Sequence, residues 1–297
     1  MSTRYTIRYT SLPRASTGTC EGREGQKSMI FLLMIPKIIH LCWLSGDSFP
    51  ENIQECIDSW KKYLPDYEIR LWDTKRFNIN STLWTQQAFA AKKYAFAADY
   101  IRLYALYTEG GIYLDSDVLV YKSFNDLLDL PYFIGQDFVG AFEPAIIGCE
   151  KGTTWIKDVL DAYENRAFIK EDGTFDMHNL PIMFFERLYP KYNFTCIHQK
   201  NDFNYNTQTI TLFDKNFFNS RNNLTIIRTP QSYCSHKFAA SWNNHKRKSI
   251  GSRLFQIMPM WLCNWVLGIN YHIIKKAIVH QYDPIYMQNH TKDKTSK

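Results

Sequence analysis

The chain has 297 residues, 45% of them hydrophobic and 16% aromatic, which is enough to bury a substantial core in one large domain or two small ones. Its net charge of +6 is uneven: the two ends, residues 1–37 and 237–297, are basic, and the stretch between them is acidic. An acidic body argues against a nucleic-acid partner, and the scattered cysteines argue against a disulfide scaffold or a structural zinc site and for a cytoplasmic protein with reduced thiols.

The first 28 residues are polar and basic and show no periodicity, so we expect them to be disordered. The apolar run at residues 29–35 is too short for a membrane span and lacks the cleavage pattern of a signal peptide. We therefore interpret residues 1–34 as a disordered or wrongly assigned extension, with translation starting at Met29 or Met34.

From residue 35 onward, strand and helix patterns alternate. The expected elements are a strand at 37–43, a helix at 51–63, a strand at 67–72, a helix at 85–107 and a strand at 112–114. This alternation predicts an α/β fold with a mostly parallel central sheet flanked by helices, and ligands bind at the carboxyl ends of such strands.

The third of these strands ends in an acidic pair. Gly110 and Gly111 stop the preceding helix, and Asp115 and Asp117 follow the strand with one residue between them. In extended chain, residues two apart point the same way, so both carboxylates can face one ligand. Such a pair suits Mg²⁺ or Mn²⁺, and a solvated Asp-rich turn is the alternative.

The helix before the acidic pair carries two charges in an apolar stretch. Asp99 and Arg102 are three residues apart and therefore share a face. Charges in so apolar a setting are costly unless they pair or bind something. A structural ion pair and a ligand contact both fit this spacing.

The last segment of the chain, residues 246–297, is basic and apolar and predicts a helical region. Its uncharged run at residues 254–269 contains Pro259 and is shorter than the about 20 residues needed to span a bilayer. Flanking basic residues and tryptophans one helical turn apart suit attachment to a membrane surface through residues 246–280, and a helix packed on the core is the alternative.

Several motifs of the body resemble, in order and spacing, the glycosyltransferase family with the DXD sugar-binding region, which includes bacterial capsule and lipopolysaccharide transferases and yeast mannosyltransferases. The motifs are residues 37–43, Ser59-Trp60, residues 65–68, Leu71-Trp72, residues 98–102, residues 110–117 and residues 236–242. The catalytic domains of large clostridial glucosylating toxins share the Asp-x-x-Arg and Tyr-x-Asp-x-Asp pattern.

The resemblance covers most of residues 35–245 and implies that this stretch is a GT-A domain. It implies a metal-dependent retaining enzyme, using Mn²⁺ or Mg²⁺, that transfers a hexose from a UDP- or GDP-linked sugar to a growing surface glycan such as capsule, exopolysaccharide or lipopolysaccharide. A lipid-linked glycan acceptor at the inner face of the bacterial cytoplasmic membrane would suit the charge layout.

The resemblance also assigns roles to individual residues. The expected catalytic residues are Asp99, Arg102, Asp115 and Asp117, and the expected donor contacts are Trp43, Asp99, Arg102, Tyr113, Asp115, Ser241 and Trp242. Asp117 and Asp115 would bind the metal, with His236 as a further ligand or simply a packed histidine. Trp43 would stack on the nucleotide base.

Two other expectations concern the acceptor side and the reaction. Asn179, after His178, caps a helix that would line the acceptor side, although capping alone also explains it. No residue is an evident nucleophile on the far face of the sugar, so the family implies front-face return, in which the leaving diphosphate helps to deprotonate the acceptor.

Two alternatives come from other classes of protein. Residues 114–118 also fit the nucleophile loop of haloacid-dehalogenase-like phosphatases, but that loop belongs near the start of its fold and here a long α/β stretch precedes it. A non-catalytic carbohydrate-binding protein is the second alternative, because tyrosines and tryptophans stack on sugars and also fill cores.

Overall fold

The computed structural model describes residues 34–137, 140–219, 221–222, 225–226, 228–237 and 282–291. The expectations for residues 1–33, for Ser241 and Trp242, and for residues 246–281 and 292–297 lie outside the described residues.

The described chain alternates strands and helices in the order expected for an α/β protein. The strands are β1 Ile38–Cys42, β2 Glu68–Trp72, β3 Gly111–Leu114, β4 Val118–Val120, β5 Tyr132–Gln136, β6 Phe142–Cys149, β7 Asn193–Ile197, β8 Thr209–Phe213, β9 Arg221–Asn222, β10 Thr225–Ile226 and β11 Cys234–His236. The helices are α1 Glu51–Tyr63, α2 Leu83–Ala90, α3 Tyr94–Glu109, α4 Thr154–Leu160, α5 Leu180–Leu188, α6 Lys215–Phe218 and α9 Pro284–Thr291.

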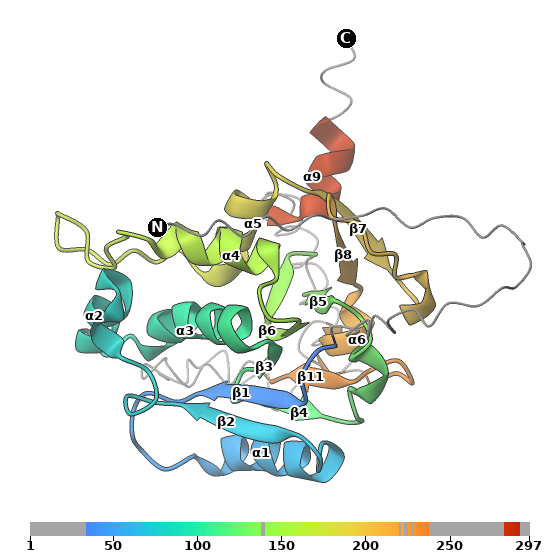
Figure 1. The fold of residues 1–297 in the computed structure, drawn as a ribbon, viewed down its shortest axis with the longest axis horizontal. Coiled ribbons are helices and arrows are strands. Elements are labelled where there is room, and N and C mark those ends of the chain that lie inside the picture. Colours follow the sequence, from blue (N-terminus) through green and yellow to red (C-terminus); the bar gives the residue numbers. More distant parts are fainter. Residues whose placement is uncertain are drawn as a thin grey trace, which may run out of the picture. The chain divides into compact units, whose positions relative to one another are not determined.

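Seven strands form one central sheet in the order β2-β1-β3-β6-β5-β8-β7 (Figure 1). β1 pairs in parallel with β2 and β3, and β8 pairs in parallel with β5 and β7. β6 is reversed and runs antiparallel to both of its neighbours, β3 and β5. The predicted α/β fold with a mostly parallel central sheet is therefore confirmed, with one reversed strand in its middle.

Helices cover both faces of the sheet, and each face has its own apolar core. One core packs α2, α3, α4 and α5 against the sheet and contains Trp84 and Phe184. The other packs α1, α6 and the β4–β11 ribbon against the opposite face and contains Trp60 and Phe218. In Figure 1, α3 and α1 accordingly lie on opposite sides of β1 and β2. The flanking helices predicted from the sequence are thus present on both faces.

The predicted helix at 85–107 is wrong in one respect, because it is two helices, α2 and α3. The chain breaks at Lys92, which takes a left-handed φ of 57°, and the N–H of Lys93 donates to the carbonyl of Ala88. The break allows the buried Trp84 indole to donate to the carbonyl of Phe96 at 2.7 Å. In one continuous helix these two residues would lie about 18 Å apart along the axis. Packing of Trp84 against α3 therefore overrides helix propensity.

Two glycines link α3 to β3. Gly110 ends the helix with φ 69°, and Gly111 begins the strand with φ 102°, both in the region that favours glycine. A Cβ on Gly111 would lie 2.8 Å from the carbonyl oxygen of Ile38 on the neighbouring strand β1. The glycine pair thus lets β3 pass close to β1 and brings residue 115 to the carboxyl edge of the sheet.

The C-terminal helical region is described only through α9. This helix contacts the edge strand β7, where Gln288 accepts from the N–H of Phe194 at 2.7 Å. Among the helices that the structure describes, none combines the length and the apolar character needed to cross a bilayer.

Candidate active site

Three potential metal ligands meet beyond the carboxyl end of β3. Asp115, Asp117 and His236 each place one ligand atom within 4.8 Å of the others. His236 Nε2 lies 3.2 Å from Asp117 Oδ1, and the Asp117 side chain is 11% exposed. The structure thus brings these three predicted residues close together.

The sequence predicts that Asp115 and Asp117 lie in extended chain, and this prediction is wrong. Residues 115–118 form a turn in which the N–H of Val118 donates to the carbonyl of Asp115 at 3.0 Å. β4 begins immediately after the turn and pairs with β11, which aligns His236 with Val118. The late part of the chain is thus hydrogen-bonded to the strand that follows Asp117, and this pairing delivers the histidine.

Arg102 joins the helix charges to the acidic pair. Its Nη2 lies 2.9 Å from Asp99 Oδ1 and 3.1 Å from Asp115 Oδ1, and its Nη1 donates to the carbonyl of Pro144 at 2.9 Å. Tyr113 donates from its hydroxyl to Asp115 at 2.9 Å, and the guanidinium of Arg102 lies over the Tyr113 ring. Four predicted site residues therefore form one contact network.

Burial controls the protonation of this network. Burial raises the pKa of Asp99 to about 7, against the attraction of Arg102, which acts to lower it. Burial likewise raises the pKa of Asp115, although Arg102 and His236 act to lower it. Both carboxyl groups are thus held where a positive charge, from Arg102 or from a bound cation, strongly favours their ionised form.

The pKa of His236 is also raised, but by neighbouring carboxylates and not by burial. Burial acts to lower the pKa of its imidazole, but Glu143 and Asp117 outweigh that effect and raise the pKa to about 10. The side chain of Glu143 is only 4% exposed, and its Oε1 lies 3.3 Å from His236 Nδ1. Without a cation, the imidazole itself supplies positive charge between two carboxylates.

Glu143 is the site residue that the sequence analysis missed. It lies near the start of β6, and because β6 runs antiparallel to β3, the start of β6 lies at the same edge as the end of β3. The N–H of Asp115 donates to the carbonyl of Ala145 at 2.9 Å, which holds the two strands together at that edge. A carboxylate followed by Pro144 within an apolar run was the signal in the sequence.

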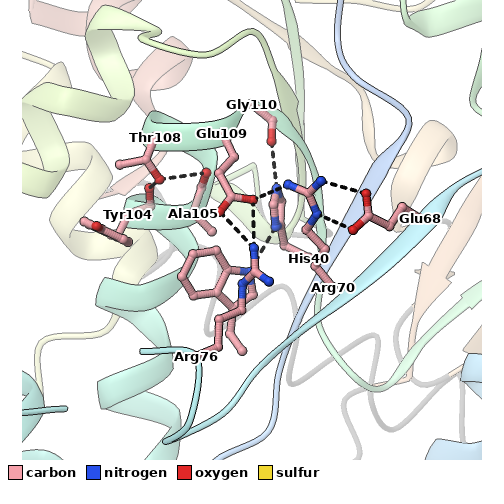
Figure 2. Close-up of polar contacts among 10 residues, drawn as sticks. His40, Glu68, Arg70, Arg76, Tyr104, Ala105, Thr108, Glu109 and Gly110 are labelled. Carbon is pink, nitrogen blue, oxygen red and sulfur yellow. Dashed lines mark hydrogen bonds and ion pairs between the residues drawn. The ribbon is translucent and has the colours of Figure 1, made fainter. Parts of the chain in front are cut away.

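A polar cluster behind the site supports the glycine pair (Figure 2). Trp72 Nε1 donates to His40 Nδ1 at 3.0 Å, so the imidazole proton lies on Nε2, which donates to the carbonyl of Gly110 at 2.7 Å. Burial lowers the pKa of His40, which keeps this ring neutral. Figure 2 shows Arg70 and Arg76 converging on Glu109, the last residue of α3. This cluster fixes the end of α3 immediately before β3.

The remaining predicted site residues are placed as follows. Trp43 directly follows β1 at the carboxyl edge, where its indole N–H donates to the carbonyl of Asp47 at 2.8 Å and its ring packs edge-to-face on Phe49. Asn179 accepts from the N–H of Ile182 and caps α5, so the capping role is confirmed. His178 bonds to Asp176 at 2.7 Å. Ser241 and Trp242 lie outside the described residues.

The donor set fits a divalent cation. Two carboxylates and an imidazole that converge within 4.8 Å offer the oxygen and nitrogen ligands that Mn²⁺ accepts, and Mg²⁺ would be held mainly by the two carboxylates. Both carboxylates lie at the edge of the sheet where α/β proteins bind ligands, which leaves the remaining coordination positions to water or to phosphate oxygens.

Comparison with known proteins gives a family match that includes four of the site residues. Residues 50–134, which contain Asp99, Arg102, Asp115 and Asp117, match the family described as "Glycosyltransferase sugar-binding region containing DXD motif". The predicted resemblance to that family is confirmed for this region.

Individual relatives agree with the family match. The chain is 30% identical over 142 residues to "Inositol phosphoceramide mannosyltransferase 3" of Schizosaccharomyces pombe, which covers 45% of this chain and 38% of that protein. It is 32% identical over 106 residues to an uncharacterized glycosyltransferase of Acanthamoeba polyphaga mimivirus, with 34% and 42% covered. The chain thus spans less than half the length of these curated relatives.

Among solved structures, the "PaToxG Glycosyltransferase" is similar, with 26% sequence identity and a TM-score of 0.43 over 53% of this chain and 69% of that chain.

Proposed function

We propose that this protein, whose residues 50–134 match the sugar-binding region of glycosyltransferases with a DXD motif, is a metal-dependent hexosyltransferase. Its donor would be a UDP- or GDP-linked sugar, and its acceptor a growing surface glycan. The proposal extends to retention of the anomeric configuration and to a GT-A fold, both of which follow from the family resemblance.

One observation carries the proposal. The acid pair and His236 meet within 4.8 Å of one another, and Arg102 pairs with both Asp115 and Asp99. A cation site and a buried Arg–Asp pair therefore adjoin at the carboxyl edge of a mostly parallel sheet. Such a site suits a ligand with a diphosphate at one end and hydroxyl groups at the other.

Each side chain then has a task toward a nucleotide-sugar donor. Asp115 and Asp117, with His236, would hold the divalent cation, and Arg102 and Asp99 would bind hydroxyl groups of the sugar. Trp43 would stack on the base, and Tyr113 would lie beside the nucleotide. When bound, the cation would stabilise the negative charge of the leaving diphosphate. Front-face return remains the proposed route, and trapping of a sugar on an Asp or Glu of this chain would contradict it.

The comparisons favour this reading over the phosphatase alternative. The family match includes both acids of the pair and also Asp99 and Arg102, which a phosphatase nucleophile loop does not require. Asp115, the would-be nucleophile, has Oδ1 occupied by Tyr113 and Arg102. Activity on a generic aryl phosphate that survived Arg102→Met would support the phosphatase instead.

The cellular setting is proposed from the sequence. A basic, apolar segment at residues 246–280 suits contact with an anionic membrane surface, and we infer a peripheral enzyme at the inner face of a bacterial cytoplasmic membrane that acts on a lipid-linked glycan. Co-sedimentation with anionic and neutral vesicles tests this. Equal recovery in the supernatant with both kinds of vesicle would contradict it.

The central experiment is a thermal-shift screen of UDP- and GDP-sugars with and without Mn²⁺. Each nucleotide sugar that binds is then assayed for its hydrolysis by the protein. Ligands that bind the native state raise the unfolding temperature. We expect a Mn²⁺-dependent shift with one nucleotide class and slow release of that nucleotide, both lost in Asp117→Ala, while the exposed control Asp58→Ala behaves as wild type. A full screen without any Mn²⁺-dependent shift would contradict the proposal.

A further inference from the structure

His236 lies between two buried carboxylates, Asp117 in the candidate cation site and the more deeply buried Glu143. Its Nε2 is 3.2 Å from Asp117 Oδ1, and its Nδ1 is 3.3 Å from Glu143 Oε1. We propose that Glu143, held by Asn219, is a positioning residue that orients the His236 ring so that Nε2 faces the cation site. This inference rests on the proposed function, because it assigns a role to residues behind that same site.

The two ring nitrogens of His236 face different carboxylates. A neutral imidazole has one N–H, and a carboxylate can only accept, so Glu143 selects the form with the proton on Nδ1. Nε2 then carries the lone pair on the side of Asp117 and Asp115. Metal-binding histidines are commonly oriented by a carboxylate at their other nitrogen, and loss of that partner typically weakens metal binding 10- to 100-fold.

Both oxygens of the Glu143 carboxylate accept hydrogen bonds. Asn219, which is fully buried, donates from its side-chain amide to Glu143 Oε2, and the N–H of Ala145 donates to Oε1 at 3.3 Å. Separate donors on the two oxygens fix the plane of the carboxylate. Three contacts thus connect Asn219 to Glu143, Glu143 to His236, and His236 to Asp117. We call this series of contacts the relay.

Burial of Glu143 is difficult to explain by a purely structural role. Burying a carboxylate costs stability unless it is fully hydrogen-bonded, and an apolar side chain of similar size would often serve the fold as well or better. Glu143 is 3% exposed and faces the imidazole of the cation site. What the carboxylate supplies, and an apolar side chain does not, is a negatively charged oxygen 3.3 Å from Nδ1.

Glu143→Gln is the decisive variant, because it keeps the size of the side chain and removes the negative charge beside Nδ1. We expect it to weaken binding of Mn²⁺ about 10- to 100-fold in the presence of the nucleotide found in the screen, as measured from the free Mn²⁺ signal by electron paramagnetic resonance. Turnover should need correspondingly more Mn²⁺, while the rate at saturating Mn²⁺ falls only a few-fold. A purely structural role would not change the Mn²⁺ requirement.

The matched control is Asp214→Asn. Asp214 is also a buried carboxylate paired with a histidine, His198 at 2.6 Å, and asparagine retains its capping acceptor for α6. We expect Glu143→Gln to lose Mn²⁺ affinity and Asp214→Asn to keep the affinity of the wild type. The two variants are compared under conditions in which the same fraction of each is folded.

The double variant Glu143→Gln with Asn219→Asp tests the relay itself. Asp at 219 accepts from the glutamine amide, which leaves the glutamine oxygen free to accept from His236 Nδ1. We expect the double variant to recover Mn²⁺ affinity relative to Glu143→Gln, a non-additive result that a direct contact predicts. Affinity in the double variant as low as in the single variant would overturn the proposal.

The outcomes separate this inference from the proposed function. If the wild-type protein binds no Mn²⁺ with any nucleotide tested, the proposed function fails. If the wild type binds Mn²⁺ and Glu143→Gln binds it equally well, only the positioning role is overturned. Should Glu143→Gln not fold, Asn219→Ala, which leaves the carboxylate in place, is measured in its stead, and unchanged affinity there counts against the relay.

Discussion

Trp60 donates from its indole N–H to the carbonyl of Val118 at 2.7 Å, which anchors the turn of the acidic pair to α1. Ser59, the preceding residue, accepts from the N–H of Val120 at 3.0 Å. Two neighbouring residues of α1 therefore hold the strand that follows Asp117. The Ser59-Trp60 motif in the sequence acquires a role as the support of the acidic turn.

Replacing Trp60 should loosen that turn. Trp60→Phe leaves the Val118 carbonyl without its donor and opens a small cavity, so we expect a loss of about 2–3 kcal/mol in the free energy of unfolding. We also expect weaker Mn²⁺ binding, measured by titration. The control is Trp84→Phe, which removes an equally buried indole and its 2.7 Å bond to Phe96. Both variants should lose similar stability, and equal Mn²⁺ binding in the two would contradict the prediction.

The second prediction concerns Arg102. In Arg102→Lys the positive charge remains, but the planar contacts to Asp99, Asp115 and the Pro144 carbonyl cannot all be made. We expect donor turnover to fall about 100-fold, because misplacement of binding groups by about 1 Å costs that much. Arg166→Lys is the control, since Arg166 also pairs with a buried carboxylate, that of Asp176. Similar losses of turnover in both variants would indicate a general effect of stability.

The glycine pair gives a prediction about stability. Gly111→Ala combines a positive φ with a Cβ 2.8 Å from the Ile38 oxygen, whereas Gly152→Ala has φ 80° and open space around the added methyl group. We expect Gly152→Ala to cost about 1–2 kcal/mol and Gly111→Ala at least about 2 kcal/mol more. Denaturant unfolding measures both costs. Equal costs would mean that the close approach of β3 to β1 has little effect on stability.

The cluster in Figure 2 predicts a dependence of stability on pH. Burial acts to raise the pKa of Glu109, but Arg70 and Arg76 outweigh it and lower the pKa below its ordinary value of 4.5. A carboxyl group whose pKa is lowered by folding stabilises the protein above its unfolded pKa, and that stability is lost as the pH falls through the folded pKa.

Glu109→Gln should therefore be less stable than wild type at pH 7, by roughly 1 kcal/mol because the pairs are partly exposed. The difference should shrink as the pH falls below about 4.5. Unfolding curves between pH 3 and pH 8 test this, with the exposed Glu171→Gln as the control. A difference that stays constant over this range would mean that the charge of Glu109 is not responsible.

Much of the fold was predictable because local signals agreed with it. The helix at 51–63 has the predicted bounds, and β3, which begins at Gly111, contains the predicted strand residues 112–114. The break at Lys92 was not predictable, since no glycine or proline marks it and packing of Trp84 on Phe96 decides it. Local propensity describes one segment at a time, whereas this break depends on two helices together.

The candidate site was predictable where a motif is short and local. Asp115, Asp117, Asp99 and Arg102 come from two neighbouring elements, and their contacts follow the expected grouping. Glu143 was missed because ligands were sought at the ends of strands, as in a parallel sheet. β6 is reversed, so its first residues take that place. Strand direction depends on the whole sheet and is not encoded by any single segment.

The pairing of β11 with β4 also sets the order in which the site is completed during synthesis. The ribosome releases the chain from its N-terminus, so Arg102, Asp115 and Asp117 emerge well before Cys234–His236. A nascent chain that has already formed α1 to β6 holds the acidic turn without its histidine. Under the proposed function, a cation can be held by all three ligands only after β11 has been added, which would make the β4–β11 pairing a timing step for activity.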